Sequence, residues 1–350
     1  RARRADISLV MIVKNEERVL ADCLASAMPF FNETILVDTG STDMTVEIAQ
    51  AAGARVFHFP WTDSFSQARN ESLRHATGRW VFWLDADDTL TPEAGEAIQS
   101  AALNAPDEVC AFVVPVQFVD EGGMPGGTRV DHVKLLRNHP DLAFEGRIHE
   151  QILPSLRQVF GPQAPVVRAA PEALVLHSGY DTSPQGQARK RERDMKLLML
   201  DLQERPGHPF VLFNLGMTEH YGGMHAEAVD WLRQCLAASG DGESHVRKAY
   251  SLLAVSQREM GDLDAALETL ARGLAAVGDD PELHFQSGYT HTLRERWEPA
   301  RRHYEAAVAG DVSGHFSSVD TGILGYKAFH NLGQVCLQTG DWPAARLWWE

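Results

Sequence analysis

The hydrophobic pattern of this chain changes once, near residue 183, and the change limits how the chain can fold. Before it, short apolar runs alternate with segments of helical spacing, which predicts a Rossmann-like, mostly parallel sheet covered by helices on both faces. After it, apolar residues recur with the 3.6-residue period of an α-helix. We therefore expect an α/β domain at 6–180, a linker helix at 181–208 and an all-α region at 209–350.

Predicted strands and helices alternate regularly in the first half. Strands are expected at 7–13, 34–37, 55–59 and 80–84, with helices at 17–27, 45–52 and 65–76 between them. Later strands are expected at 109–119, at 132–136 and within 166–177, and a glycine-rich segment at 121–128 separates the first two of these. These first two are expected to be either strands of a mixed sheet or the two arms of a hairpin, so the sheet as a whole is expected to be mostly parallel but mixed.

The second half starts with a charged helix at 187–203 and continues with an internal repeat. Each unit has a small residue, a turn residue seven positions later and an alanine twelve positions later; the small residues are Gly216, Ala254, Gly288 and Gly333. The interval from Ala254 to Gly288 is 34 residues, the length of a tetratricopeptide repeat. We expect about four helical hairpins, the last one truncated, with a loop at 310–322.

Charge and composition exclude several classes of protein. A net charge of −16 disfavours nucleic acid as a partner, and it would repel an anionic ligand unless a cation or local Arg and Lys groups reverse the potential. No apolar run has the roughly 18–20 residues of a membrane span, and no secretory signal is visible. Four dispersed cysteines favour reduced thiols in a cytoplasmic protein. Because the chain starts at Arg1 and ends inside a helical pattern, we interpret it as part of a longer protein.

An apolar strand that ends in three carboxylates is the strongest local signal for chemistry. Trp80–Leu84 is followed directly by Asp85, Asp87 and Asp88. Ligands bind at the carboxyl ends of strands in open α/β sheets, and carboxylate oxygens suit Mg²⁺ or Mn²⁺, which in turn hold a diphosphate. The alternative is an acidic turn that caps the helix following Thr91.

Three other segments are candidates for the same ligand crevice. Lys14, Asn15 and Glu16 follow the first strand, where they either face the ligand or start a helix with Asn15 as its cap. Asp38 ends the second strand, where a carboxylate can accept hydrogen bonds from a base N–H or a ribose hydroxyl. Arg69 lies on the helix before the acidic strand end, and it is either a solvated charge or a partner for a carboxylate or phosphate.

These segments together carry a resemblance to a known family. Residues 12–16, 37–43, 68–70 and 83–88 occur in the order found in family-2 glycosyltransferases with the GT-A fold, and the similarity continues more weakly through 134–138, 146–150 and 176–180. With the repeats added, the chain most resembles bacterial peptide S- and O-glycosyltransferases and relatives similar to lipooligosaccharide β-1,4-glucosyltransferases.

The resemblance implies a role for each candidate residue. Asp38 would bind the nucleotide base, while Lys14, Asn15 and Glu16 would line the base and ribose pocket. Asp85 would face the ribose, and Asp87 would bind a divalent cation, Mn²⁺ or Mg²⁺, through the metal-binding motif Asp-x-Asp. His177 would complete the metal shell; its alternative is a buried histidine bonded to backbone.

Members of this family that invert the sugar need a base for the acceptor. Glu150 is the first candidate and Asp88 the second, although His149-Glu150 could also be an ordinary polar strand end. The cation neutralises the departing diphosphate, with Arg69 or Arg147 assisting.

The resemblance also implies the partners. A nucleotide sugar, with UDP-sugars expected first, would be the donor, and a peptide, protein or glycan would be the acceptor. The repeats would bind a protein acceptor or mediate a homodimer. The alternative function is a non-catalytic scaffold of repeats on a degenerate transferase domain. A glycoside hydrolase also uses paired carboxylates, but it would leave Asp38 and Lys14 without a role.

Overall fold

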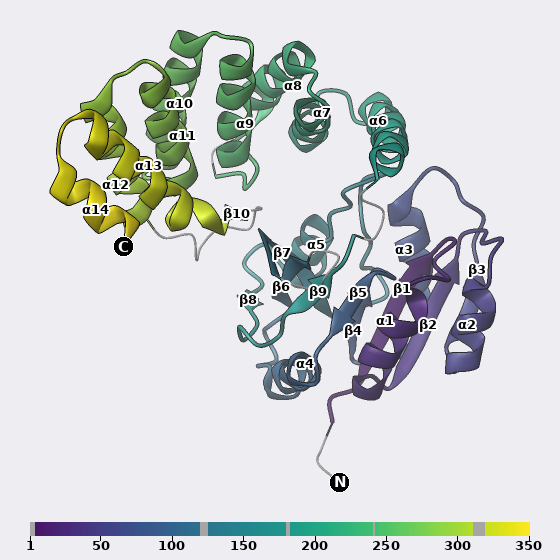
Figure 1. Ribbon diagram of the computed structural model, residues 1–350. Helices are drawn as coiled ribbons and strands as arrows, with labels where there is room; N and C mark the ends of the chain where they lie inside the picture. Colours follow the sequence, from purple (N-terminus) through teal and green to yellow (C-terminus); the bar gives the residue numbers. More distant parts are fainter. Residues whose placement is uncertain (1–3, 120–124, 180–182, 241, 311–318) are drawn as a thin grey trace. The chain divides into compact units, whose positions relative to one another are not determined.

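The computed structural model describes residues 4–119, 125–179, 183–240, 242–310 and 319–350. It consists of two compact units that divide after Gln187 (Figure 1). Each unit has hydrophobic clusters of its own. None of the described helices combines the length and the apolar character that crossing a membrane would require.

Four parallel strands form one half of the sheet in the first unit. They are β1 (Ile7–Val13), β2 (Glu33–Asp38), β3 (Arg55–His58) and β4 (Trp80–Leu84), in the order β3-β2-β1-β4. The helices between them are α1 (Leu20–Ala27), α2 (Thr45–Ala52) and α3 (Phe65–Arg74). The predicted alternation is therefore confirmed, but α1 starts later than expected because the Leu20 and Val19 amides both donate to the Glu16 carbonyl in a turn.

The other half of the sheet is mixed, as expected. It contains β5 (Asp88–Leu90), β6 (Ala111–Val119), β7 (Pro125–Arg137), β8 (Val166–Arg168) and β9 (Val175–His177). β7 is antiparallel to both β4 and β6, β9 is parallel to β6, and β5 closes this edge antiparallel to β9. β7 begins within the segment expected to be a connection, of which residues 121–124 lie outside the described part.

Three elements of this half lacked a predicted range. α4 (Pro92–Asn104) follows the acidic cluster, and α5 (Leu153–Phe160) follows the loop that carries Glu150. β5 has only three residues, too few for a period to be recognised.

Alternating side chains of β4 pack on opposite faces of the sheet. Trp80, Phe82 and Leu84 belong to one hydrophobic cluster, while Val81 and Trp83 belong to the other. Such alternation is the two-residue period of a strand, and burial on both sides explains why the run is apolar throughout. The strand therefore has no solvent-facing side until it ends at the acidic cluster.

The second unit starts within α6 (Pro184–Glu204) and continues with four helical hairpins. Their helix pairs are α7 (Pro209–Tyr221) with α8 (His225–Ala238), α9 (Val246–Glu259) with α10 (Leu263–Val277), α11 (Pro281–Leu293) with α12 (Trp297–Ala309), and α13 (Tyr326–Gln338) with α14 (Trp342–Trp349). Of the loop expected at 310–322, residues 311–318 lie outside the described part.

The turn residues of the repeat behave as predicted. Gly223, Gly261, Glu295 and Gly340 follow the first helix of each hairpin, and all have positive φ, between 55° and 86°. The small residues allow close helix contact, because a Cβ added to Gly288 would lie 2.8 Å from the Tyr304 ring.

Candidate active site

The carboxyl ends of β2, β1 and β4 lie next to one another because these strands are parallel neighbours. This arrangement brings Lys14–Glu16, Asp38 and the acidic cluster to one edge of the sheet. The other predicted residues reach that edge from elsewhere: Arg69 from α3, Glu150 from a loop and His177 from β9.

The loops after β1 and β2 are hydrogen-bonded to each other. Asn15 has a φ of 59°; its amide donates to Ser41 Oγ at 2.9 Å and its Oδ1 accepts from the Thr42 amide at 2.8 Å. The Glu16 amide donates to Thr45 Oγ1 at 2.7 Å. Since the residue at the N-cap of α1 is Val19, the reading of Asn15 as that cap is wrong. The two loops instead form one polar wall beside the exposed Lys14.

Asp38 is buried and shapes the second of these loops. Its carboxylate accepts hydrogen bonds from the amides of Ser41 at 3.0 Å and Gly40 at 3.2 Å, and lies 3.3 Å from His58 Nδ1. Burial acts to raise the pKa of Asp38, but the hydrogen bonds from Ser41, His58 and Gly40 lower it below the ordinary value. Asp38 is therefore an ionised acceptor at neutral pH.

The acidic cluster forms a turn between β4 and β5. The Asp85 amide donates to Asp88 Oδ2 at 3.0 Å, and the Asp88 amide donates to the Asp85 carbonyl at 3.1 Å. The cap of the following α4 is Thr91, whose Oγ1 accepts from the Ala94 amide, so the alternative reading of the carboxylates as a helix cap is wrong.

Asp88 is the most enclosed of the three carboxylates. Lys134 Nζ lies 2.8 Å from its Oδ2, and His177 Nδ1 lies 3.0 Å from its Oδ1. Burial would raise the pKa of Asp88, but the Lys134 ammonium and the His177 hydrogen bond hold it well below its ordinary value. Every contact of Asp88 thus serves to hold the turn and the neighbouring strand.

Asp87 lies in a different environment. His177 Nδ1 is 3.5 Å from its Oδ1, and across the described ranges no lysine or arginine forms an ion pair with it. Burial, together with the Asp85 and Asp88 carboxylates, raises the pKa of Asp87 above its ordinary value, while His177 acts in the opposite direction. Ligand atoms of Asp87, Asp88 and His177 lie within 4.8 Å of one another, so this group could hold a metal ion.

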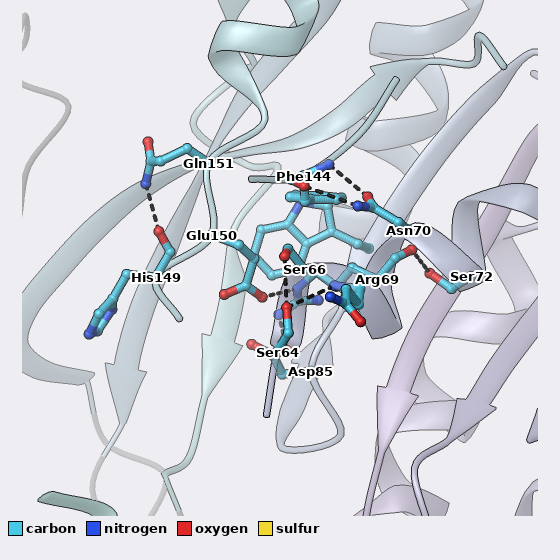
Figure 2. Close-up of polar contacts among 12 residues, drawn as sticks. Ser64, Ser66, Arg69, Asn70, Ser72, Asp85, Phe144, His149, Glu150 and Gln151 are labelled. Carbon is cyan, nitrogen blue, oxygen red and sulfur yellow. Dashed lines mark hydrogen bonds and ion pairs between the residues drawn. The ribbon is translucent and has the colours of Figure 1, made fainter. Parts of the chain in front are cut away.

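Arg69 joins the acidic cluster to Glu150. Its Nη2 donates to Asp85 Oδ1 at 2.8 Å and its Nε donates to Glu150 Oε1 (Figure 2). Burial would lower the pKa of Arg69, but the two carboxylates raise it above the ordinary value. The alternative of a solvated surface charge is therefore wrong, because Arg69 is only 8% exposed.

The loop that carries Glu150 is held by backbone contacts. The amides and carbonyls of Glu145 and Gln151 bond to each other at 2.9 Å, and His149 between them has a φ of 53°. Arg147 ties the loop to the start of α3: its carbonyl accepts from the Phe65 amide and its Nη1 donates to the Asp63 carbonyl. In Figure 2 the Glu150 carboxylate turns toward Arg69, whereas the His149 ring points away.

Three further residues of the site had no predicted role. Lys134 pairs with Asp88, Trp83 lies under two cations, and the Asn70 side chain forms two hydrogen bonds with the Phe144 backbone, at 2.7 and 3.0 Å. The sequence did contain a signal for Lys134, because it is a charged residue within a strand expected to be buried, at 132–136. A lysine is almost never fully buried unless it is paired, so its position indicated a buried ion pair.

Comparison with known proteins identifies both parts of the chain. Residues 8–157 match the family described as Glycosyl transferase family 2, and residues 248–279 and 328–350 match the Tetratricopeptide repeat. A TPR repeat-containing protein of Synechococcus elongatus is 38% identical over 272 residues, which are 76% of this chain and 65% of that protein. The SPbeta prophage-derived glycosyltransferase SunS of Bacillus subtilis is 28% identical over 66% of this chain and 53% of its own length.

Solved structures are similar over shorter stretches. The glucosyl-3-phosphoglycerate synthase of Mycobacterium tuberculosis, in complex with Mn²⁺, UDP-glucose and phosphoglyceric acid, is 27% identical over 34% of this chain and 45% of that one, with a TM-score of 0.28.

The chain spans between half and two thirds of the length of the two curated relatives. By these matches, residues 8–157 form a glycosyl transferase family 2 domain, and tetratricopeptide repeats follow it in the chain.

Proposed function

We propose that the protein is a metal-dependent, inverting glycosyltransferase that moves a hexose from a nucleotide-diphosphate sugar, with UDP-sugars as the first candidates, to a peptide, protein or glycan. The observation that carries the proposal is the unequal pairing of the acidic cluster. In the described part of the chain, Arg69 pairs with Asp85 and Lys134 pairs with Asp88, whereas the ion-pair partner of Asp87 is His177, which also contacts Asp88.

The charges of the acidic cluster and of its direct ion-pair partners support a cation there. Four carboxylates, those of Asp85, Asp87, Asp88 and Glu150, stand against the two cations of Arg69 and Lys134, which leaves two negative charges when His177 is neutral. One divalent cation would balance them. Without it, an anionic donor would meet an anionic crevice.

The residues present fit Mn²⁺ or Mg²⁺. Asp87 and His177 would hold the cation, and the Asp87 carboxylate is a ligand that suits both ions. When bound, the cation would stabilise the charge that develops on the departing diphosphate.

Other residues at this edge of the sheet would bind the nucleoside part of the donor. Asp38 and the wall formed by Lys14, Asn15 and Glu16 would bind the nucleoside. The Asp85 side chain is 39% exposed at this edge, so it can reach the ribose while Arg69 holds its other side.

Glu150 is the preferred base. Within the described part of the chain, its carboxylate accepts one hydrogen bond, from Arg69 to Oε1, so Oε2 remains to take a proton from the acceptor. Asp88, the second candidate, is less suited, because it is almost fully buried and both of its oxygens are bonded.

The repeats are proposed to bind a protein acceptor. Aromatic and apolar side chains are exposed on the first helices of the hairpins, among them Tyr221, Tyr289 and Leu293. A homodimer through the repeats is the second proposal, and light scattering at micromolar concentration separates the two. Four buried free thiols, Cys23, Cys110, Cys235 and Cys336, support a cytoplasmic location.

Calorimetric titration of UDP-glucose, UDP-N-acetylglucosamine and GDP-mannose, with and without Mn²⁺, tests the proposal. We expect one donor to bind in a Mn²⁺-dependent way and to be hydrolysed slowly. If no nucleotide sugar binds under either condition, the transferase proposal fails and the non-catalytic scaffold takes its place.

A further inference from the structure

Trp83 is held rigidly beside the acidic cluster. It lies in β4, two residues before Asp85, and its indole N–H donates to the Val133 carbonyl at 2.9 Å. The Phe144 ring meets it edge-on, with ring centroids 6.4 Å apart. The orientation of the indole is therefore set from two sides.

Both cations of the cluster lie over this indole. Arg69 Cζ is 4.3 Å and Lys134 Nζ is 3.7 Å from the ring centroid. The two side chains come from different elements, α3 and β7, and each also pairs with one carboxylate of the turn. Tryptophan attracts cations more strongly than any other aromatic side chain, so Trp83 provides a common anchor for both.

We propose that Trp83 is a positioning residue for the metal-binding turn. By holding both cations, it determines where Asp85 and Asp88 are anchored, and so leaves Asp87, between them, directed at His177. This inference rests on the proposed function, because the benefit of the arrangement is cation binding by Asp87. Groups that orient metal ligands in this way contribute strongly to metal affinity without touching the ion.

The same strand supplies a control for ordinary core packing. Trp80 is also buried in β4, and it too has a cation over its ring, with Arg137 Cζ 4.7 Å from the centroid. Arg137 donates to the Val109 and Pro106 carbonyls rather than to the acidic cluster. Trp80 therefore shares the burial, the strand and the cation contact of Trp83, but within the described residues the cation over its ring does not pair with a carboxylate of the turn.

The test compares Trp83→Leu, Trp83→Phe and Trp80→Leu with the wild-type chain. Mn²⁺ alone is titrated calorimetrically, and thermal unfolding is recorded without metal. We expect Trp83→Leu to weaken Mn²⁺ binding by about 10- to 100-fold, the range found for groups that orient metal ligands. Trp83→Phe should fall between Trp83→Leu and wild type, and Trp80→Leu should lower the Tm while leaving the Mn²⁺ affinity within about twofold, since only packing is lost.

The outcomes separate the inference from the function on which it rests. If the wild-type chain binds Mn²⁺ and both leucine variants bind it equally well, Trp83 only packs, and the inference is overturned while the proposed function stands. If the wild-type chain binds no Mn²⁺, both are overturned. If Trp83→Leu does not fold, Trp83→Phe decides: affinity equal to wild type and to Trp80→Leu contradicts the positioning role.

Discussion

Lys134 Nζ lies 2.8 Å from Asp88 Oδ2, and each residue is only 1% exposed. The pair links β7 to the turn between β4 and β5, where Asp88 also accepts from the Asp85 amide. A buried ion pair adds little net stability compared with apolar side chains, but losing one partner leaves an unpaired buried charge. The pair therefore makes the shape of the turn depend on both residues at once.

Removing Lys134 should destabilise the first unit strongly. We expect Lys134→Met to lower the free energy of unfolding by about 3–5 kcal/mol, because the Asp88 carboxylate then has no buried cation. Urea denaturation measures the change. The double variant Lys134→Met/Asp88→Asn should recover part of the loss, and a double variant less stable than Lys134→Met would contradict this account.

Replacing Glu150 should impair chemistry and spare binding. Glu150→Gln keeps the shape of the side chain and an acceptor for Arg69, but it cannot take a proton, so kcat should fall by about 10²–10⁴-fold. Mn²⁺-dependent donor binding, followed by calorimetry, should be unchanged. Glu145→Gln is the matched control, since Glu145 is exposed and takes part in the same loop through its backbone. Full turnover by Glu150→Gln would remove Glu150 as the base.

Removing the carboxylate of Asp87 should abolish the metal response. Asp87→Asn leaves the Asp85–Arg69 and Asp88–Lys134 pairs in place and removes the charge that faces His177, so Mn²⁺ binding and Mn²⁺-dependent donor binding should both be lost. Chelation of the metal should have the same effect on the wild-type chain. Glu93→Gln, at the start of α4, is a control that should bind Mn²⁺ normally.

The stability of the first unit should fall in acid partly through Asp38. Its pKa is below the ordinary 3.8 in the folded chain, so the unfolded chain binds the proton more tightly. Its contribution is complete above the unfolded pKa and is lost as the pH falls from about 5 through 3.8 toward the folded value. Urea denaturation at pH 6 and pH 3 should therefore show a smaller loss for Asp38→Asn than for wild type; equal losses would contradict it.

One turn of the repeats contains backbone strain that glycine should remove. Glu295 has a φ of 55° at the position where the other three hairpins have glycine. We expect Glu295→Gly to stabilise the second unit by about 1 kcal/mol, since the left-handed conformation costs a side-chain-bearing residue about that much. Glu298→Gly, in the first turn of α12, should instead destabilise, because glycine is unfavourable within a helix. Thermal unfolding of both variants provides the comparison.

The sequence by itself determined the elements whose signals are local. The apolar runs of β1, β2 and β4 predict a buried sheet, and in a parallel sheet that also places Asp38 and Asp85 at one edge. The repeat could also be predicted from local signals, because each hairpin has its own small residue and its own turn residue. Gly223, for example, provides the positive φ that the turn of the first hairpin needs. Gly288 allows the close contact with Tyr304 inside the third hairpin.

Only the tertiary structure decided which groups meet at the acidic cluster. The register of β5 with β9 places Asp88 opposite His177, 89 residues away, and the loop at 145–151 places Glu150 on Arg69, 81 residues away. Lys134 reaches Asp88 across 46 residues, from a position inside β7. These contacts follow from strand pairing and loop packing between residues far apart in the sequence. The hydrophobic period of a single segment does not indicate such contacts. The pairing of Asp85 with Arg69 and of Asp88 with Lys134, which leaves Asp87 for the proposed cation, is therefore a property of the folded sheet.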